Sequence, residues 1–131
     1  MSKTFHLEII TPTNIYTEKN VSYVRADSLE GQIGIMAKHT QATIALGIGE
    51  IKVVINGKKY YYATSGGYAD IQPEGVLLLL ETAEKYTDID VNRAEDSQKR
   101  AKLRISDKTT DQVRARTSIA KANNRLKISK R

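Results

Sequence analysis

The chain has no cysteine and no tryptophan among its 131 residues, and only two prolines and one phenylalanine. Without cysteine there are no disulfides, thiolate nucleophiles or cysteine-ligated metal sites, and this composition fits a cytosolic setting. Long apolar runs are also missing, since the longest, residues 76–80, is far too short to span a bilayer. Residues 1–5 contain no apolar stretch behind a basic start, so no signal peptide is expected. We therefore expect any membrane association to come through a partner.

The formal net charge of +6 is unevenly distributed along the chain. Up to Glu81 there are seven basic and eight acidic residues, whereas the remainder has fourteen basic and seven acidic residues. This length and this division suit one compact domain followed by a small appendage. The basic tail predicts an anionic partner, such as nucleic acid, a nucleotide phosphate or an acidic protein surface.

Short strands and regular turns are predicted for the first part. Alternating apolar and polar residues indicate a strand over residues 5–9, and further strands are expected over residues 21–26 and 68–71. Asn56-Gly57 separates two strand-like runs, residues 51–55 and 58–62, and this dipeptide favours a type I′ hairpin turn. Gly31 and Gly34 indicate a sharp bend or a close approach of backbone. The five consecutive apolar residues 76–80 predict a strand buried on both faces. Many such strands imply a sandwich or a small barrel.

The last part is predicted to form two helices, because no proline or glycine follows Asp90. Asp90 is a good N-cap for the first helix. Apolar and small residues recur at helical spacing in two stripes, which are Val91, Ala94, Gln98, Ala101 and Ile105, and then Ala115, Ile119, Ala122 and Leu126. The polar residues 107–111 interrupt the pattern, which predicts an antiparallel helical hairpin. Alanine-rich contacts bury little area, at about 25 cal/mol per Å², so we expect the hairpin to be detachable.

Cationic residues follow the same spacing on both predicted helices. They are Arg93, Arg100 and Arg104 on the first, and Arg114, Lys121 and Arg125 on the second. In an antiparallel hairpin Arg93 would approach Lys121 and Arg125 beside a helix N-terminus, which favours an anion. An ordinary solvated basic face is the more common explanation of such spacing.

No catalytic residue and no metal site is predicted. His6 and His39 are far apart in sequence and have no partner at ligand spacing. Ser65-Gly66-Gly67 is not a phosphate-cradling loop, because no lysine follows it at the required position. Tyr60-Tyr61-Tyr62 beside Lys58 and Lys59 could stack nucleic-acid bases, which leaves open a free-standing nucleic-acid or anionic-ligand binding module.

The order of these features resembles the epsilon subunit of rotary, proton-translocating ATP synthases over essentially the whole chain. The segments that carry the resemblance are residues 5–12, residues 30–35 followed by His39, Ser65-Gly66-Gly67-Tyr68, residues 81–84 and residues 88–94. The resemblance implies a mainly β plus α fold, in which a β-sandwich or flattened barrel (1–86) precedes an antiparallel two-helix hairpin (87–131). It also implies a non-catalytic subunit of the rotor stalk that couples proton-driven rotation to ATP synthesis.

The resemblance further implies partners and contact residues. The sandwich would dock on the gamma subunit and the ring of c subunits, with Glu30, Gln32 and His39 as subunit-contact residues. The hairpin would extend toward the catalytic alpha and beta subunits and inhibit ATP hydrolysis. No cofactor is required. The location implied is the cytoplasmic face of a bacterial cell membrane, as a peripheral part of the complex.

A regulatory ATP site is implied as well, because some bacterial members bind ATP through an Ile/Leu-Asp-x-x-Arg-Ala motif. Residues 89–94 match that motif completely. The residues implied for ATP are Glu84, Asp90, Arg93, Ala94, Arg100, Lys121 and Arg125. Lys121 stands where the pattern prefers arginine, which keeps the charge but loses the bidentate phosphate geometry.

Overall fold

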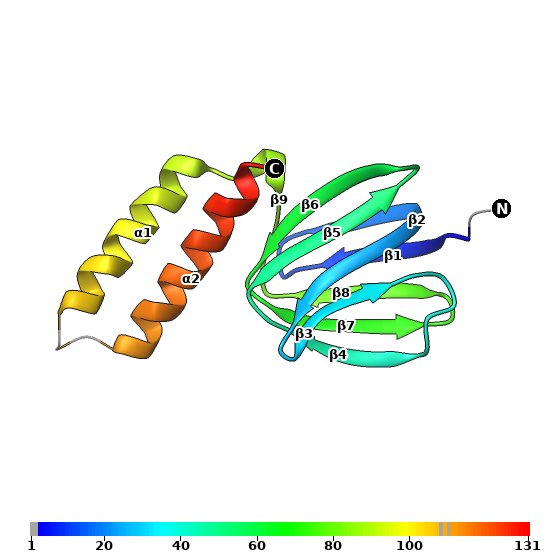
Figure 1. Ribbon diagram of the computed structural model, residues 1–131, viewed down its shortest axis with the longest axis horizontal. Helices are drawn as coiled ribbons and strands as arrows, with labels where there is room; N and C mark the ends of the chain where they lie inside the picture. The colour runs from blue at the N-terminus through cyan, green and yellow to red at the C-terminus, as the bar shows by residue number, and fades with distance from the viewer. Residues whose placement is uncertain (1–2, 108, 110) are drawn as a thin grey trace.

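Nine strands occupy the first two thirds of the chain and two helices follow them, in a computed structural model that describes residues 3–107, 109 and 111–131 (Figure 1). The strands are β1 (Phe5–Ile10), β2 (Ile15–Ser28), β3 (Gly31–Ile35), β4 (Ala42–Leu46), β5 (Gly49–Ile55), β6 (Lys58–Thr64), β7 (Gly67–Gln72), β8 (Gly75–Leu80) and β9 (Ala83–Lys85). A 3₁₀ turn η1 (Tyr86–Asp88) leads into the helices α1 (Val91–Ser106) and α2 (Gln112–Ser129).

The strands form one sheet that folds back on itself. Their order is β1-β8-β7-β4-β2-β5-β6-β9, with β3 also paired to β2. β1 lies parallel to β8 and antiparallel to β2, which brings the two halves of the sheet together. Side chains between the two layers form the core, so the predicted sandwich followed by a helical hairpin is confirmed.

Apolar side chains fill the core, and their burial follows the alternation of the strands. Leu7, Ile9 and Val24 are fully buried, as are Ile35 and Leu78. Tyr62 also lies inside, with its ring edge-on to Tyr16 at 5.5 Å between centroids. Burial raises the pKa of Tyr62 to about 12.

Glycines at two positions, one in a turn and one in a strand, shape the sheet as their backbone angles require. Asn56 and Gly57 have φ of 52° and 77°, so the predicted hairpin turn between β5 and β6 is confirmed. Gly67 has φ of 150°, and a Cβ there would collide with the backbone of Leu79 on the paired strand β8. Only glycine allows β7 and β8 to pair this closely.

Several details of the predicted strands were wrong. β8 is not buried on both faces, because Val76, Leu78 and Leu80 point inward while Leu79 is 44% exposed. The Gly31–Gly34 segment continues as strand β3 rather than bending sharply. A Cβ on Gly34 would nevertheless meet the Tyr23 hydroxyl at 2.9 Å, so a close approach exists there. Strands β4 and β9 were not predicted, because their sequences show too little alternation of apolar and polar residues. β4 forms by pairing with β7, and β9 forms by pairing with β6.

The two helices form an antiparallel hairpin beside the sandwich, each with an aspartate at its start (Figure 1). Asp90 accepts a hydrogen bond from the Arg93 backbone nitrogen at 3.0 Å, so the predicted N-cap is confirmed, and Asp111 makes the same bond to Arg114 at 3.1 Å. The buried seam consists of Ala94, Ala101, Ala115 and Ala122. Of the predicted interrupting residues 107–111, residues 108 and 110 lie outside the described part of the chain.

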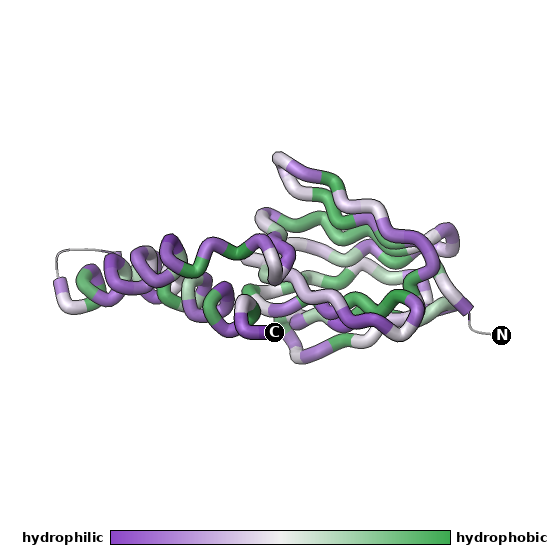
Figure 2. Tube along the Cα trace, turned by 90° about the horizontal axis from the view of Figure 1, so that it is seen from above, coloured by the Kyte–Doolittle hydropathy of each residue, from purple (hydrophilic) through white to green (hydrophobic). Residues whose placement is uncertain are grey.

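Hydropathy separates the two parts clearly. Apolar segments concentrate in the strands, whereas the helical hairpin is mostly hydrophilic (Figure 2). Within the described ranges, neither helix combines the length and the apolar character that crossing a bilayer needs.

Candidate functional site

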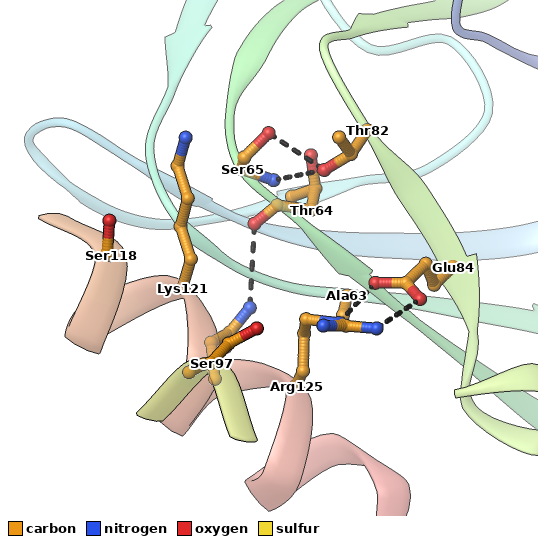
Figure 3. Close-up of a pocket in the computed structure, with 11 residues that line it drawn as sticks. Ala63, Thr64, Ser65, Thr82, Glu84, Ser97, Ser118, Lys121 and Arg125 are labelled. Carbon is orange, nitrogen blue, oxygen red and sulfur yellow. Dashed lines mark hydrogen bonds and ion pairs between the residues drawn. The ribbon is translucent and has the colours of Figure 1, made fainter. Parts of the chain in front are cut away.

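A cleft of about 300 Å³ lies between one end of the sandwich and the hairpin (Figure 3). Strands β6 and β9 provide one wall and α2 provides the other, with a single contribution from α1. The lining residues are Ala63, Thr64, Ser65, Thr82, Glu84, Ser97, Ser118, Lys121, Ala122, Asn124 and Arg125. The cleft exists only while the hairpin lies against the sandwich, because its two walls come from different parts of the fold.

An ion pair crosses the cleft from α2 to β9. The Arg125 Nη2 donates to Glu84 Oε2 at 3.0 Å, and Arg125 Nε lies 2.6 Å from Glu84 Oε1. That Nε contact is ionic rather than a well-directed hydrogen bond, since among the described residues Nε has no partner in hydrogen-bond geometry. The two side chains are 22% and 33% exposed, so solvent screens the pair only in part.

Hydroxyl and amide groups line the rest of the cleft. Ser65 donates its backbone N–H to Thr82 Oγ1 at 3.1 Å, and the two hydroxyls lie 2.7 Å apart. Asn124 donates to the carbonyl of Gly49 at 2.8 Å, which ties α2 to the start of β5. Half-buried Lys121 adds a second cation to the α2 wall. Two cations and several hydroxyls suit an anionic ligand, and among the described residues there is no cluster of three metal-ligating side chains.

Three of the seven residues predicted to hold ATP line this cleft, namely Glu84, Lys121 and Arg125. Arg125 already has Glu84 as its counterion, so a phosphate would have to compete with that carboxylate.

The other four predicted residues lie on or before α1 and outside the cleft lining. Asp90 caps the helix, and Ala94 is buried in the alanine seam. Arg93 and Arg100 are exposed. They lie four residues before and three residues after Ser97, so both share the helix face that reaches the cleft, and Arg100 donates to Ser97 Oγ at 3.4 Å.

The predicted subunit-contact residues do not form one cluster. Glu30 is exposed in the turn between β2 and β3, and Gln32 is exposed at the start of β3. His39 lies beyond the other end of β3, where its Nδ1 is 2.7 Å from the Thr40 carbonyl. The length of β3 separates the two places.

Sequence reasoning missed the residues that dock the hairpin. Asn124, Ile128 and Arg131 recur at spacings of four and three and contact the sandwich from α2 or just beyond it. Ile128 is fully buried against Ala63 and Ile89. Ile128, a single isoleucine in a basic stretch, could have indicated a buried contact. It lies outside the alanine stripe that defined the predicted helix face.

Comparisons with known proteins cover both parts of the chain. The family described as "ATP synthase, Delta/Epsilon chain, beta-sandwich domain" matches residues 4–86, and the corresponding "long alpha-helix domain" matches residues 87–130. An ATP synthase epsilon chain of Nitratidesulfovibrio vulgaris is 35% identical over 130 residues, which are 98% of this chain and 97% of that protein. One from Desulforamulus reducens is 34% identical and covers 98% of this chain and 99% of that protein.

Solved structures share the fold. A chain in the cryo-EM structure of the Euglena gracilis mitochondrial ATP synthase has a TM-score of 0.79 at 20% identity, covering 92% of this chain and 78% of that chain. A chain in the Tetrahymena thermophila mitochondrial ATP synthase, in a structure of the central stalk and c-ring, has a TM-score of 0.65 at 13% identity, covering 98% of both chains.

Proposed function

The chain belongs to the ATP synthase delta/epsilon family and is similar over its full length to epsilon chains, and we propose that it is a non-catalytic subunit of the rotating central stalk. In that role it couples proton-driven rotation to ATP synthesis. The observation that carries the proposal is the pair of consecutive family matches, which account for the sandwich and the hairpin together. A free-standing nucleic-acid module with a basic tail would leave the sandwich match unexplained.

The sandwich is the part proposed to dock on the gamma subunit and the c-ring. Its outer surface exposes Tyr68 and Leu79, which are direct cross-strand partners on β7 and β8. Exposed apolar groups of this kind suit a protein contact. Glu30, Gln32 and His39 remain the proposed polar contacts, at two separate places along β3. Through these contacts the subunit would sit at the cytoplasmic face of a bacterial membrane without entering it.

The hairpin is the part proposed to inhibit ATP hydrolysis. It is held to the sandwich by a small set of contacts, among them buried Ile128 and the ion pair of Arg125 with Glu84. A contact of this size can open at modest cost, and an extended hairpin would present its excess of basic residues to acidic segments of the catalytic alpha and beta subunits.

Reconstitution tests both parts of this function. The full chain is expected to form a stoichiometric complex with the gamma subunit. A chain that ends at Thr87 should still do so, because no described residue of the hairpin belongs to the sandwich core. The shortened chain should raise ATP hydrolysis by the assembled enzyme. Absence of a complex with the full chain would refute the stalk role, whereas unchanged hydrolysis with the shortened chain would refute inhibition alone.

ATP is the proposed regulatory ligand of the docked hairpin. The cleft provides Lys121 and Arg125, and Arg93 and Arg100 lie on the α1 face that borders it. Titration calorimetry should detect ATP binding to the full chain, and Arg125→Ala should weaken binding about tenfold or more, as expected for a charged hydrogen-bond partner. Arg116→Ala removes an exposed cation from the same helix and is the matched control. Equal affinities for both variants would show that the cleft does not hold the nucleotide.

A further inference from the structure

Arg131, just beyond α2, forms an ion pair with Glu50 on strand β5 of the sandwich. Its Nε donates to Oε2 at 2.8 Å and its Nη2 donates to Oε1 at 3.0 Å, so the pair is bidentate. The guanidinium also lies over the ring of Tyr61, 4.8 Å from the centroid. The Arg131 backbone nitrogen donates to the carbonyl of Ile128 at 3.0 Å, which links this arginine to the residue that docks α2. This contact lies outside the cleft described above.

Glu50 has a second arginine that belongs to the sandwich itself. Arg25 Nη2 on β2 donates to Glu50 Oε1 at 3.1 Å, and the Glu50 side chain is only 11% exposed. The Glu50 backbone is held as well, since its N–H donates to Asp27 Oδ2 at 3.0 Å. A carboxylate buried this far is costly to leave without a cation. Arg25 therefore keeps Glu50 paired when the hairpin leaves.

The groups around Glu50 are mostly cationic, so Arg131 is attracted to the Glu50 carboxylate and not to its neighbours. Lys52 lies near it, and the pKa of Lys52 is lowered first by desolvation and then by neighbouring cations that include Lys59, Arg25 and Arg131. The pKa of Arg131 is raised by its hydrogen bond to Glu50. Arg131 thus enters a cation-rich surface where Glu50 provides the attraction.

We propose that Arg131 is a latch that sets how often the hairpin leaves the sandwich, and that Arg25 lowers the cost of opening because it keeps Glu50 paired in the open state. This rests on the hairpin mobility proposed above. The two arginines have opposite effects on docking. Loss of Arg131 removes a contact made only when the hairpin is docked. Loss of Arg25 removes the cation that stays with Glu50 when the hairpin leaves, so opening separates Glu50 from its remaining arginine partner and becomes more costly.

Distance measurements on the full chain test the latch. Because the chain has no cysteine, dyes can be placed selectively at Lys58→Cys beside the β5–β6 turn and Lys102→Cys on α1. Energy transfer between them, over a temperature series that populates both states, gives the ratio of undocked to docked hairpin. Arg131→Gln should raise that ratio about tenfold, as expected for the loss of charged hydrogen bonds. Arg131→Lys should have an intermediate effect, because lysine cannot form the bidentate pair.

The controls distinguish a latch from general charge loss. Lys130→Gln removes an adjacent exposed cation and should change the ratio less than about twofold. Arg25→Gln should lower the ratio. Because Arg25 is part of the sandwich, unfolding of the sandwich in this variant is measured separately. Equal effects of Arg131→Gln and Lys130→Gln, or a rise in the ratio with Arg25→Gln, would overturn the proposal.

The rate of ATP hydrolysis by the reconstituted enzyme tests the latch and the inhibitory role of the hairpin independently. If Arg131→Gln releases the hairpin but leaves hydrolysis unchanged, the latch stands and inhibition by the hairpin fails. If Arg131→Gln leaves the hairpin docked, the latch fails, and the chain that ends at Thr87 still decides whether the hairpin inhibits.

Discussion

The sandwich and the hairpin bury different kinds of side chain. The sandwich core is rich in large aliphatic residues such as Leu7, Ile9 and Leu78. The seam between the helices consists of alanines, and Ile128 is the large side chain that is fully buried within α1 and α2. Since stabilisation scales with the apolar area buried, at about 25 cal/mol per Å², the sandwich has its own source of stability and the hairpin depends on docking.

The contact between the two parts is narrow and mixed in character. It consists mainly of the α2 face that carries Asn124, Arg125 and Ile128, with Arg131 beyond it. Away from the sandwich, near the loop that joins the helices, Leu103 and Val113 are exposed. The sandwich therefore has a core of its own, whereas the hairpin is held to it by a small set of contacts.

The largest effect is expected in the sandwich core. Leu78→Ala deletes a fully buried side chain from β8 and should lower the free energy of unfolding by about 2–5 kcal/mol, because it removes buried apolar area and leaves a cavity. Urea denaturation measures this loss. Leu79→Ala, at the next position and 44% exposed, should cost about 0.5 kcal/mol or less. Similar losses for both variants would contradict the alternating burial of β8.

A smaller effect, confined to docking of the hairpin, is expected at Ile128. Ile128→Ala should shift the hairpin toward the undocked state by about 2 kcal/mol, near the low end for a buried isoleucine, because the cluster around Ile128 is small. Energy transfer from Lys58→Cys to Lys102→Cys measures the shift, and the urea midpoint of the sandwich should stay unchanged. Val113→Ala, 74% exposed on the same helix, is the control. Loss of sandwich stability with Ile128→Ala would mean that the two parts fold as one unit.

The parts of the fold that could be predicted are those with local signals. Asn56-Gly57 predicted its hairpin turn because only a few dipeptides accept two positive φ values, and Asp90 predicted a helix start for an equally local reason. The residues 76–80 gave no such signal. A continuous apolar run has no period, so the exposed face of β8 is decided by its neighbours β1 and β7.

The candidate site was predictable only in part, because its contacts are distant in sequence. The stripe on α2 placed Lys121 and Arg125 on one face, and the structure keeps them together in the cleft. Glu84 pairs with Arg125 across 41 residues and Glu50 pairs with Arg131 across 81. Helical periodicity says which residues share a face, but it cannot say which strand end that face meets.

The smallest effect on stability is expected at the starts of the two helices. Comparing the two caps there distinguishes helix capping from ligand binding. Asp90→Ala and Asp111→Ala remove equivalent caps of α1 and α2, with bonds of 3.0 and 3.1 Å, and each should cost about 1 kcal/mol of hairpin stability. Helical circular dichroism on heating measures both. If Asp90 also contributes to the proposed ATP site, only Asp90→Ala will weaken ATP binding in calorimetry. Equal ATP affinity of the two variants would leave Asp90 as a cap alone and would restrict the proposed ATP site to the arginines and Lys121.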